Sequence, residues 1–145
     1  MSIEANKTIV RRTFEEIFTQ GNLALVDTWI AATFVNHAAP IEMLPGPESL
    51  KGHVVLLRMA FPDLHFTVEE LIADEERVAA RVTFGGTHRG VFQGFPPTDR
   101  SFVQSQMHMV RFVKGKVVEH WAVRDDLDLM QQLGTVPSEG AASSP

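Results

Sequence analysis

The sequence predicts a single α+β domain, in which N-terminal helices and a strongly curved antiparallel sheet form a cone around one pocket. Apolar residues recur with helical spacing over residues 3–61, and they alternate with polar residues after Pro62. Two of the predicted strands, residues 77–88 and 101–113, exceed the usual strand length, so the sheet must bend or coil. A coiled sheet with helices across its mouth leaves a concave, mostly apolar space, where small molecules bind.

Three helices are expected in the first half of the chain. The first ends at Gly21, and the second covers residues 23–32. Residues 34–46 contain several turn-forming residues and are expected to form an irregular loop. The third helix follows this loop and is stopped by Pro62. The spacing predicts a buried side made of Val10, Phe14, Ile17, Phe18, Leu25, Trp29, Ile30, Leu50, Val54, Leu57 and Phe61.

Four strands and a short helix are expected after the third helix. Asp125 or Asp126 can cap the final helix, which ends at Gly134. Residues 135–145 are small and polar and are expected to be a disordered tail, so the predicted domain covers residues 1–134. The strands are predicted at residues 66–72, 77–88, 101–113 and 117–123.

Composition and charge exclude several classes of function. A net charge of -5 argues against nucleic acid as a partner, because phosphate binding needs clustered Lys and Arg. The chain has no cysteine, and no two histidines have the H-E-x-x-H spacing, so no metal site is expected. No apolar run has the length of a membrane span, and residues 1–20 do not resemble a signal peptide. We therefore expect a cytoplasmic protein without a membrane partner, and no sign of a required cofactor is present.

The hairpin around Lys114 predicts which polar residues face the pocket. A three-residue loop, 114–116, would place His108 opposite Ala122 and His120 opposite Val110. Because side chains alternate along a strand, two imidazoles and a guanidinium would then share one apolar face. The predicted face consists of Gln106, His108, Val110, Phe112, Val118, His120, Ala122 and Arg124.

Histidine at position 108 is the first candidate for a general base. An imidazole has an unperturbed pKa of about 6.5 and can exchange a proton at neutral pH. The alternative is a histidine that is only hydrogen-bonded within the sheet. The same alternative applies to His120, which Glu119 and Arg124 could hold in place.

The other candidates have structural alternatives as well. Asp125 stands where a helix cap is expected, and Asn36 and His37 lie in the predicted loop, where they could face a ligand or stabilise a turn. Phe18 and Trp29 are expected in the core, although aromatic residues also line apolar pockets.

Several short motifs occur in a characteristic order between residues 5 and 134. They are Asn36-His37, Gly46-Pro47-Glu48, Phe61-Pro62-Asp63-Leu64, Gly86-Thr87-His88-x-Gly90, Gly94-Phe95-Pro96-Pro97-Thr98-Asp99-Arg100, His108-x-x-Arg111-Phe112, Gly115-Lys116-Val117 and Gln132-Leu133-Gly134. In order and spacing the chain resembles the SnoaL-like polyketide cyclases, also called ester cyclases.

This resemblance implies a fold, a chemistry and a partner. It implies a nuclear transport factor 2-like cone that often forms a homodimer through the outer face of its sheet. It also implies cofactor-free ring closure of a polyketide methyl ester by intramolecular aldol chemistry, with an Asp acting as acid and base near a His. The His matches His108, whereas the Asp falls on Ala122, and a second family Asp matches Asp125.

Three hypotheses follow from the resemblance and from the alanine. The first is an enzyme of the cyclase or isomerase type that acts on a small apolar carbonyl substrate. It would use His108 with Asp125 or His120 in place of the lost carboxylate. The second is a non-catalytic module that binds a small molecule in the same pocket. The third is a diverged hydroxylase or epoxide hydrolase, because one scaffold hosts many reactions.

Overall fold

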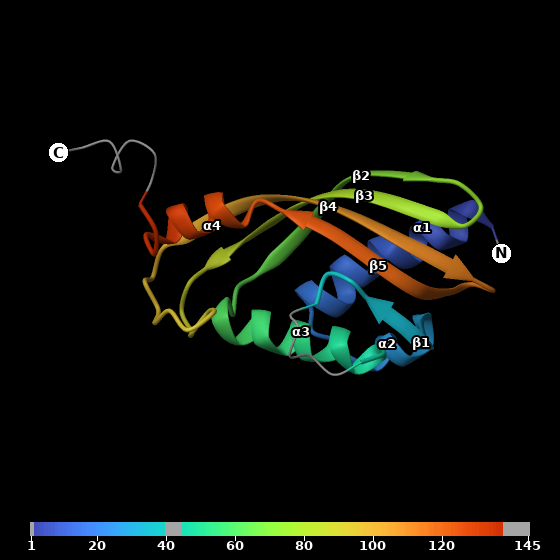
Figure 1. Ribbon diagram of the computed structural model, residues 1–145, viewed down its shortest axis with the longest axis horizontal. Coiled ribbons are helices and arrows are strands. Elements are labelled where there is room, and N and C mark those ends of the chain that lie inside the picture. Colours follow the sequence, from blue (N-terminus) through green and yellow to red (C-terminus); the bar gives the residue numbers. More distant parts are fainter. Residues whose placement is uncertain (1, 40–44, 138–145) are drawn as a thin grey trace.

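Helices lie along one face of a curved five-stranded sheet in the computed structural model, which describes residues 2–39 and 45–137 (Figure 1). The predicted α+β class is therefore confirmed. The helices are α1 (Ile3–Arg12), the π-helical segment η1 (Thr13–Thr19), α2 (Ala24–Trp29), α3 (Pro47–Ala60) and α4 (Asp126–Leu133). The strands are β1 (Ile30–Asn36), β2 (His65–Ala73), β3 (Arg77–Thr87), β4 (Ser101–Val113) and β5 (Lys116–Arg124).

The strand order in the sheet is β1-β5-β4-β3-β2. Strands β2 to β5 form the expected antiparallel meander, and β1 adds a parallel edge strand next to β5. The predicted helix at residues 23–32 is confirmed over Ala24–Trp29, but its predicted end and the start of the loop at residue 34 are wrong, because Ile30–Asn36 is extended. Its β-branched residues favour a strand, and its partner β5 lies more than 80 residues further along the chain.

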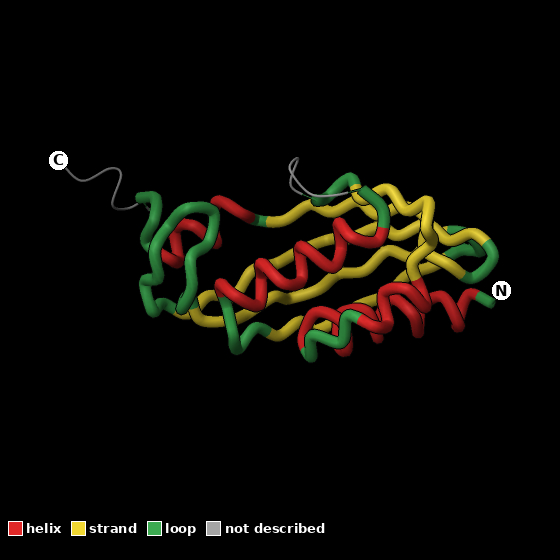
Figure 2. The backbone as a smooth tube through the Cα atoms, turned by 90° about the horizontal axis from the view of Figure 1, so that it is seen from below, coloured by secondary structure: helices red, strands yellow, loops and turns green. Residues whose placement is uncertain are grey.

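The α1–η1 pair and α3 cover the concave face of the sheet, as the view from below shows (Figure 2). In η1 the aromatic side chains of Phe14 and Phe18 are buried against the sheet, as the spacing predicts. The hydroxyl of Thr19 donates to the carbonyl of Phe14 and accepts the N–H of Phe66, which ties the π-turn to β2. The helical wall thus holds two phenyl rings over the sheet.

Strand β4 alternates between buried residues and more exposed ones along its whole length. Its pairing with β5 places His108 opposite Ala122 and Val110 opposite His120, as predicted. The three-residue loop is wrong: Val113 pairs with Lys116, and a bulge after Arg111 compensates for the shorter turn. The bulge puts Val117 inside the fold and leaves Val118 partly exposed, contrary to the predicted face.

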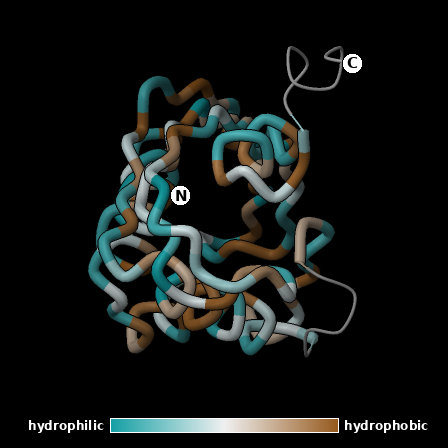
Figure 3. The backbone as a smooth tube through the Cα atoms, turned by 90° about the vertical axis from the view of Figure 1, so that its left-hand side faces the viewer, coloured by the Kyte–Doolittle hydropathy of each residue, from teal (hydrophilic) through white to brown (hydrophobic). Residues whose placement is uncertain are grey.

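Seen from one end, the backbone runs around a central space (Figure 3). At the α4 end of the sheet this space is filled by a cluster of phenyl rings, among them Phe61, Phe84 and Phe102. Of the predicted tail, residues 138–145 lie outside the described residues, and Thr135 hydrogen-bonds back to Met130 of α4. No helix of the described chain has the length and apolar character needed to cross a membrane.

Candidate functional site

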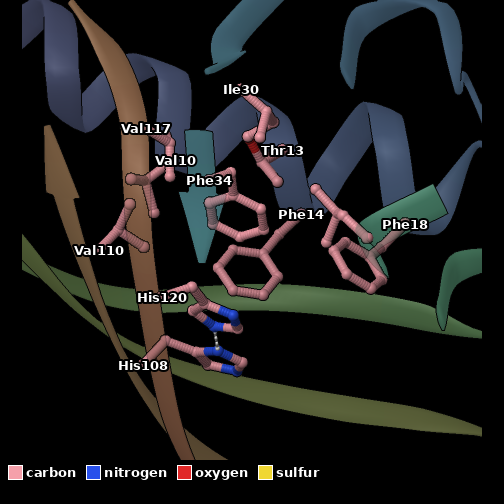
Figure 4. Close-up of a pocket in the computed structure, with 11 residues that line it drawn as sticks. Val10, Thr13, Phe14, Phe18, Ile30, Phe34, His108, Val110, Val117 and His120 are labelled. Carbon is pink, nitrogen blue, oxygen red and sulfur yellow. Dashed lines mark hydrogen bonds between the residues drawn. The ribbon is translucent and has the colours of Figure 1, made fainter. Parts of the chain in front are cut away.

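Two cavities meet at the side chain of His108. The smaller one, about 40 Å³, is apolar and lies between η1 and the strands, with His108 and His120 on its floor (Figure 4). The larger one, about 270 Å³, extends along β4 toward α4 and is lined by both apolar and polar groups. Phe14 and Phe18 separate the two spaces and line both of them. Besides His108 and His120, their polar lining residues are His53, Gln93, Gln104, Gln106, Arg124 and Asp126 in the larger cavity and Thr13 in the smaller one.

Six polar side chains form a continuous hydrogen-bonded row beneath these cavities, which we call the polar chain. It runs from the end of β1 across β5 and β4 to the start of α4. In order, its members are Asn36, His120, His108, Gln106, Gln104 and Asp126, and the successive distances between bonding atoms are 2.9, 2.8, 2.7, 2.7 and 3.0 Å. The alternation of β4 places Gln104, Gln106 and His108 on one face, so these three members follow from the strand itself.

The two histidines at the centre are almost entirely removed from solvent. His108 is 5% exposed and His120 9% exposed, and their rings are nearly parallel, with 6° between the planes. Phe14 packs edge-on against His108 with 4.8 Å between ring centroids. This packing fixes the orientation of the imidazole within the apolar surroundings.

Electrostatics keep both imidazoles neutral at pH 7. Burial, followed by the charges of His120, Arg124 and His53, holds the pKa of His108 well below its ordinary value. Burial and then Arg124 lower the pKa of His120 to about 3. Burial also lowers the pKa of His53, on α3, to about 4. A neutral ring in an apolar site has a lone pair that can accept a proton.

Among the described residues, Arg124 is the one arginine whose side chain lines the larger cavity. Its Nη1 donates to the carbonyl of Ala38 at 3.2 Å, and burial lowers its pKa. A cationic donor that lines a buried cavity is suited to hold a negatively charged oxygen.

The structure brings together most of the predicted site residues. His108, His120, Asn36, Gln106 and Arg124 are joined in the polar chain or line its cavities, and Phe18 lines both cavities. Ala122 lies opposite His108 on the same face of β5 as His120.

Three predicted residues lie elsewhere. Asp125 is exposed and caps α4 by accepting the N–H of Asp128, so its placement favours the structural alternative. His37 stacks on Trp121 with 5.0 Å between ring centroids and pairs with Glu119 outside the cavities. Trp29 is buried under the guanidinium of Arg12 and lines neither cavity.

Sequence reasoning missed three polar residues of the site, Gln104, Asp126 and His53. Gln104 could have been predicted from the alternation of the strand, because it lies two residues before Gln106 and four before His108 and therefore shares their face. At Asp126 the sequence predicts only a helix cap, and nothing local shows that its carboxylate points back to β4. Within residues 2–39 and 45–137, no three histidine, aspartate or glutamate side chains converge as ligands of a metal ion.

Comparison with known proteins identifies the family of this chain. Residues 8–133 match the family model of SnoaL-like polyketide cyclase. The chain is 33% identical over 131 residues to the aklanonic acid methyl ester cyclase DnrD of Streptomyces peucetius, covering 87% of this chain and 88% of that protein. It is 32% identical over 120 residues to the nogalonic acid methyl ester cyclase of Streptomyces nogalater, covering 81% and 89%.

Solved structures show the same fold. TsrD from Streptomyces laurentii superimposes with a TM-score of 0.86 at 20% identity and covers 94% of this chain and 99% of that one. The chain therefore belongs to the SnoaL-like polyketide cyclase family, as its motifs indicate. Its fold is the nuclear transport factor 2-like cone that the resemblance implies, with an open and not a closed sheet.

Proposed function

We propose that this protein is a cofactor-free cyclase of the ester cyclase type, which closes a ring in a small apolar polyketide-like ester by acid–base chemistry. The neutral His108–His120 pair is the proton acceptor, and the larger cavity holds the substrate. One observation carries this proposal: two neutral imidazoles, hydrogen-bonded to each other, lie on the floor of an apolar cavity.

The reaction balances without any further reagent. The imidazole pair takes a proton from the carbon next to a substrate carbonyl and leaves an enolate. The enolate carbon forms a bond to a second carbonyl carbon of the same molecule, whose oxygen becomes an alkoxide. The alkoxide then takes the proton back from the imidazolium, so substrate and product have the same mass.

Arg124 and the pocket walls have supporting roles in this proposal. The guanidinium lies near the cavity that would hold the enolate oxygen, where a preorganised cation stabilises developing negative charge. The phenyl rings of Phe14 and Phe18 exclude water, which strengthens that interaction.

The direct experiment uses the substrate named by the relatives. Purified protein is incubated with aklanonic acid methyl ester, and a product of unchanged mass with a new retention time is expected by chromatography. Nogalonic acid methyl ester is tested in parallel, because the two related cyclases differ in the substrate that they are named for. Absence of both products would contradict the proposed reaction.

A non-catalytic binding module is the second candidate, and one observation favours it. Residue 122, opposite His108, is alanine, and no carboxylate of the described residues hydrogen-bonds either imidazole. Such a module would bind aklanonic acid methyl ester, as calorimetry would measure, and return it unchanged.

We also propose that the protein is a homodimer through the outer face of β4 and β5. This face exposes the side chains of Val103, Met107, Met109 and Val123, and Met107 lies directly opposite Val123 across the two strands. A contiguous apolar patch on a sheet is typical of an interface, and a symmetric pair of copies would bury it on both sides.

Replacement of Met107 by glutamate is expected to convert the dimer to a monomer, because the symmetric interface would contain two facing carboxylates. Light scattering after size exclusion measures the mass. The control is Leu56→Glu, which places the same charge on an exposed apolar position of α3. A monomeric wild type, or a Met107→Glu variant that remains dimeric, would contradict this interface.

A further inference from the structure

The polar chain ends in a hydrogen-bond acceptor on both sides. At one end, the carboxylate of Asp126 has no proton to give and accepts from Gln104 Nε2 at 3.0 Å. At the other end, Asn36 Oδ1 already accepts the N–H of Ala38 at 3.1 Å, so this oxygen, and not the amide nitrogen, faces His120 Nδ1. Each end therefore requires its neighbour to be a donor.

The Asp126 end fixes the tautomer of His108. Because Gln104 donates to the carboxylate through its amide nitrogen, its oxygen accepts from Gln106 Nε2 at 2.7 Å. The oxygen of Gln106 then faces His108 Nε2 at 2.7 Å, and this nitrogen must carry the proton. In a neutral His108 the lone pair is therefore on Nδ1, the atom that faces His120.

The Asn36 end fixes the tautomer of His120 in the same way. Its Nδ1 donates to Asn36 Oδ1 at 2.9 Å, so the lone pair of a neutral His120 is on Nε2. The two lone pairs meet, with 2.8 Å between His108 Nδ1 and His120 Nε2 and only 6° between the ring planes. Five hydrogen bonds thus share four available protons, and the missing proton belongs at the link between the imidazoles.

We propose that His108 Nδ1 and His120 Nε2 together form a binding site for one shared proton, and that Asp126 is a positioning residue that keeps this site open. Asp126 acts through Gln104 and Gln106, because its carboxylate sets the direction of every hydrogen bond as far as His108. The role of this site in catalysis rests on the proposed function, because the shared proton would be the one that the substrate gives up.

The charges around the pair limit it to a single proton. Positive charge at the pair is disfavoured by Arg124 on β5, His53 on α3 and His37 after β1. The carboxylate at the end of the polar chain is Asp126 on α4. One proton between two nitrogens completes every hydrogen bond and spreads its charge over two rings. A second proton would break the link between the rings, so the pair titrates as a unit.

An isosteric change at Asp126 distinguishes this arrangement from a merely structural one. In Asp126→Asn, the new amide can donate to the oxygen of Gln104, and both glutamines can then turn over. Gln106 would donate to His108 Nε2, and the proton of His108 would move to Nδ1, where it bonds to His120. The variant thus supplies the missing proton, and the expected result is a switch of His108 from the Nε2–H to the Nδ1–H tautomer.

The experiment is long-range ¹H–¹⁵N NMR of protein labelled with ¹⁵N-histidine, recorded without substrate from pH 9 down to the onset of acid unfolding. In the wild type, His108 is expected as Nε2–H and His120 as Nδ1–H at high pH. Both facing nitrogens should then shift together in one step of proton uptake. In Asp126→Asn this step is expected about one to two pH units lower, because no unsatisfied lone pair remains to be relieved.

Asp128→Asn is the matched control, since it removes the same charge from the same helix, and the carboxylate of Asp128 accepts from Gln132 outside the polar chain. This control should keep the wild-type tautomers. An unchanged His108 tautomer in Asp126→Asn, independent titration of the two rings, or no proton uptake before unfolding would each overturn the inference. Because the NMR needs no substrate, its failure is distinguishable from failure of the cyclase assay.

Discussion

Replacement of His108 by glutamine is expected to lower the turnover of aklanonic acid methyl ester by about 10²- to 10⁴-fold, the usual contribution of a positioned general base. Glutamine keeps a polar group that can bond to Gln106 and His120, but it cannot take up a proton. The rate is measured by product chromatography, and the melting temperature is recorded alongside it. We expect the melting temperature to stay close to that of the wild type.

The matched control is His65→Gln, which makes the same exchange at an exposed position at the start of β2. This variant should retain full activity. Full activity in His108→Gln, with or without a loss of stability, would show that His108 has only a structural role.

Replacement of Ala122 by aspartate is expected to raise the cyclase rate about tenfold or more. Residue 122 lies directly opposite His108, so a carboxylate there would be within a few ångströms of the imidazole pair. A neighbouring negative charge stabilises the protonated form, and the pKa of the pair should rise by about one to three units. The base would then take up the substrate proton more readily at neutral pH.

Ala122→Asn is the control for this gain, because asparagine has the same shape without the charge. The initial rate and the ¹⁵N-histidine titration are measured for both variants. An equal gain in the asparagine variant would assign the effect to shape, and a raised pKa without a faster reaction would show that proton uptake does not limit the rate.

Much of this fold was predictable because its signals are local. The change from helical to alternating periodicity after Pro62 reflects side-chain directions in helices and strands, and it locates the meander. The register that brings His108 opposite Ala122 was predicted with the wrong loop length. It holds because the bulge near Val118 replaces the residue that the shorter turn removes.

Other features depend on contacts between distant parts of the chain. Strand β1 forms because Ile30 pairs with Val117 and Asn36 pairs with His120. No local sequence pattern predicts a parallel partner so distant along the chain. Asp126 shows the same limit, since its sequence position predicts a helix start and only the closed fold brings its carboxylate to Gln104. The polar chain is thus a property of the tertiary structure, although its middle members follow one strand face.

Exchange of the substrate's α-protons in D₂O tests the central claim most directly, because it reports proton abstraction by the imidazole pair whether or not the ring closes. Mass spectrometry of aklanonic acid methyl ester should show deuterium uptake that is accelerated by the wild type and not by His108→Gln. Exchange at the protein-free rate, or equal exchange with both proteins, would contradict an account in which His108 and His120 accept the proton.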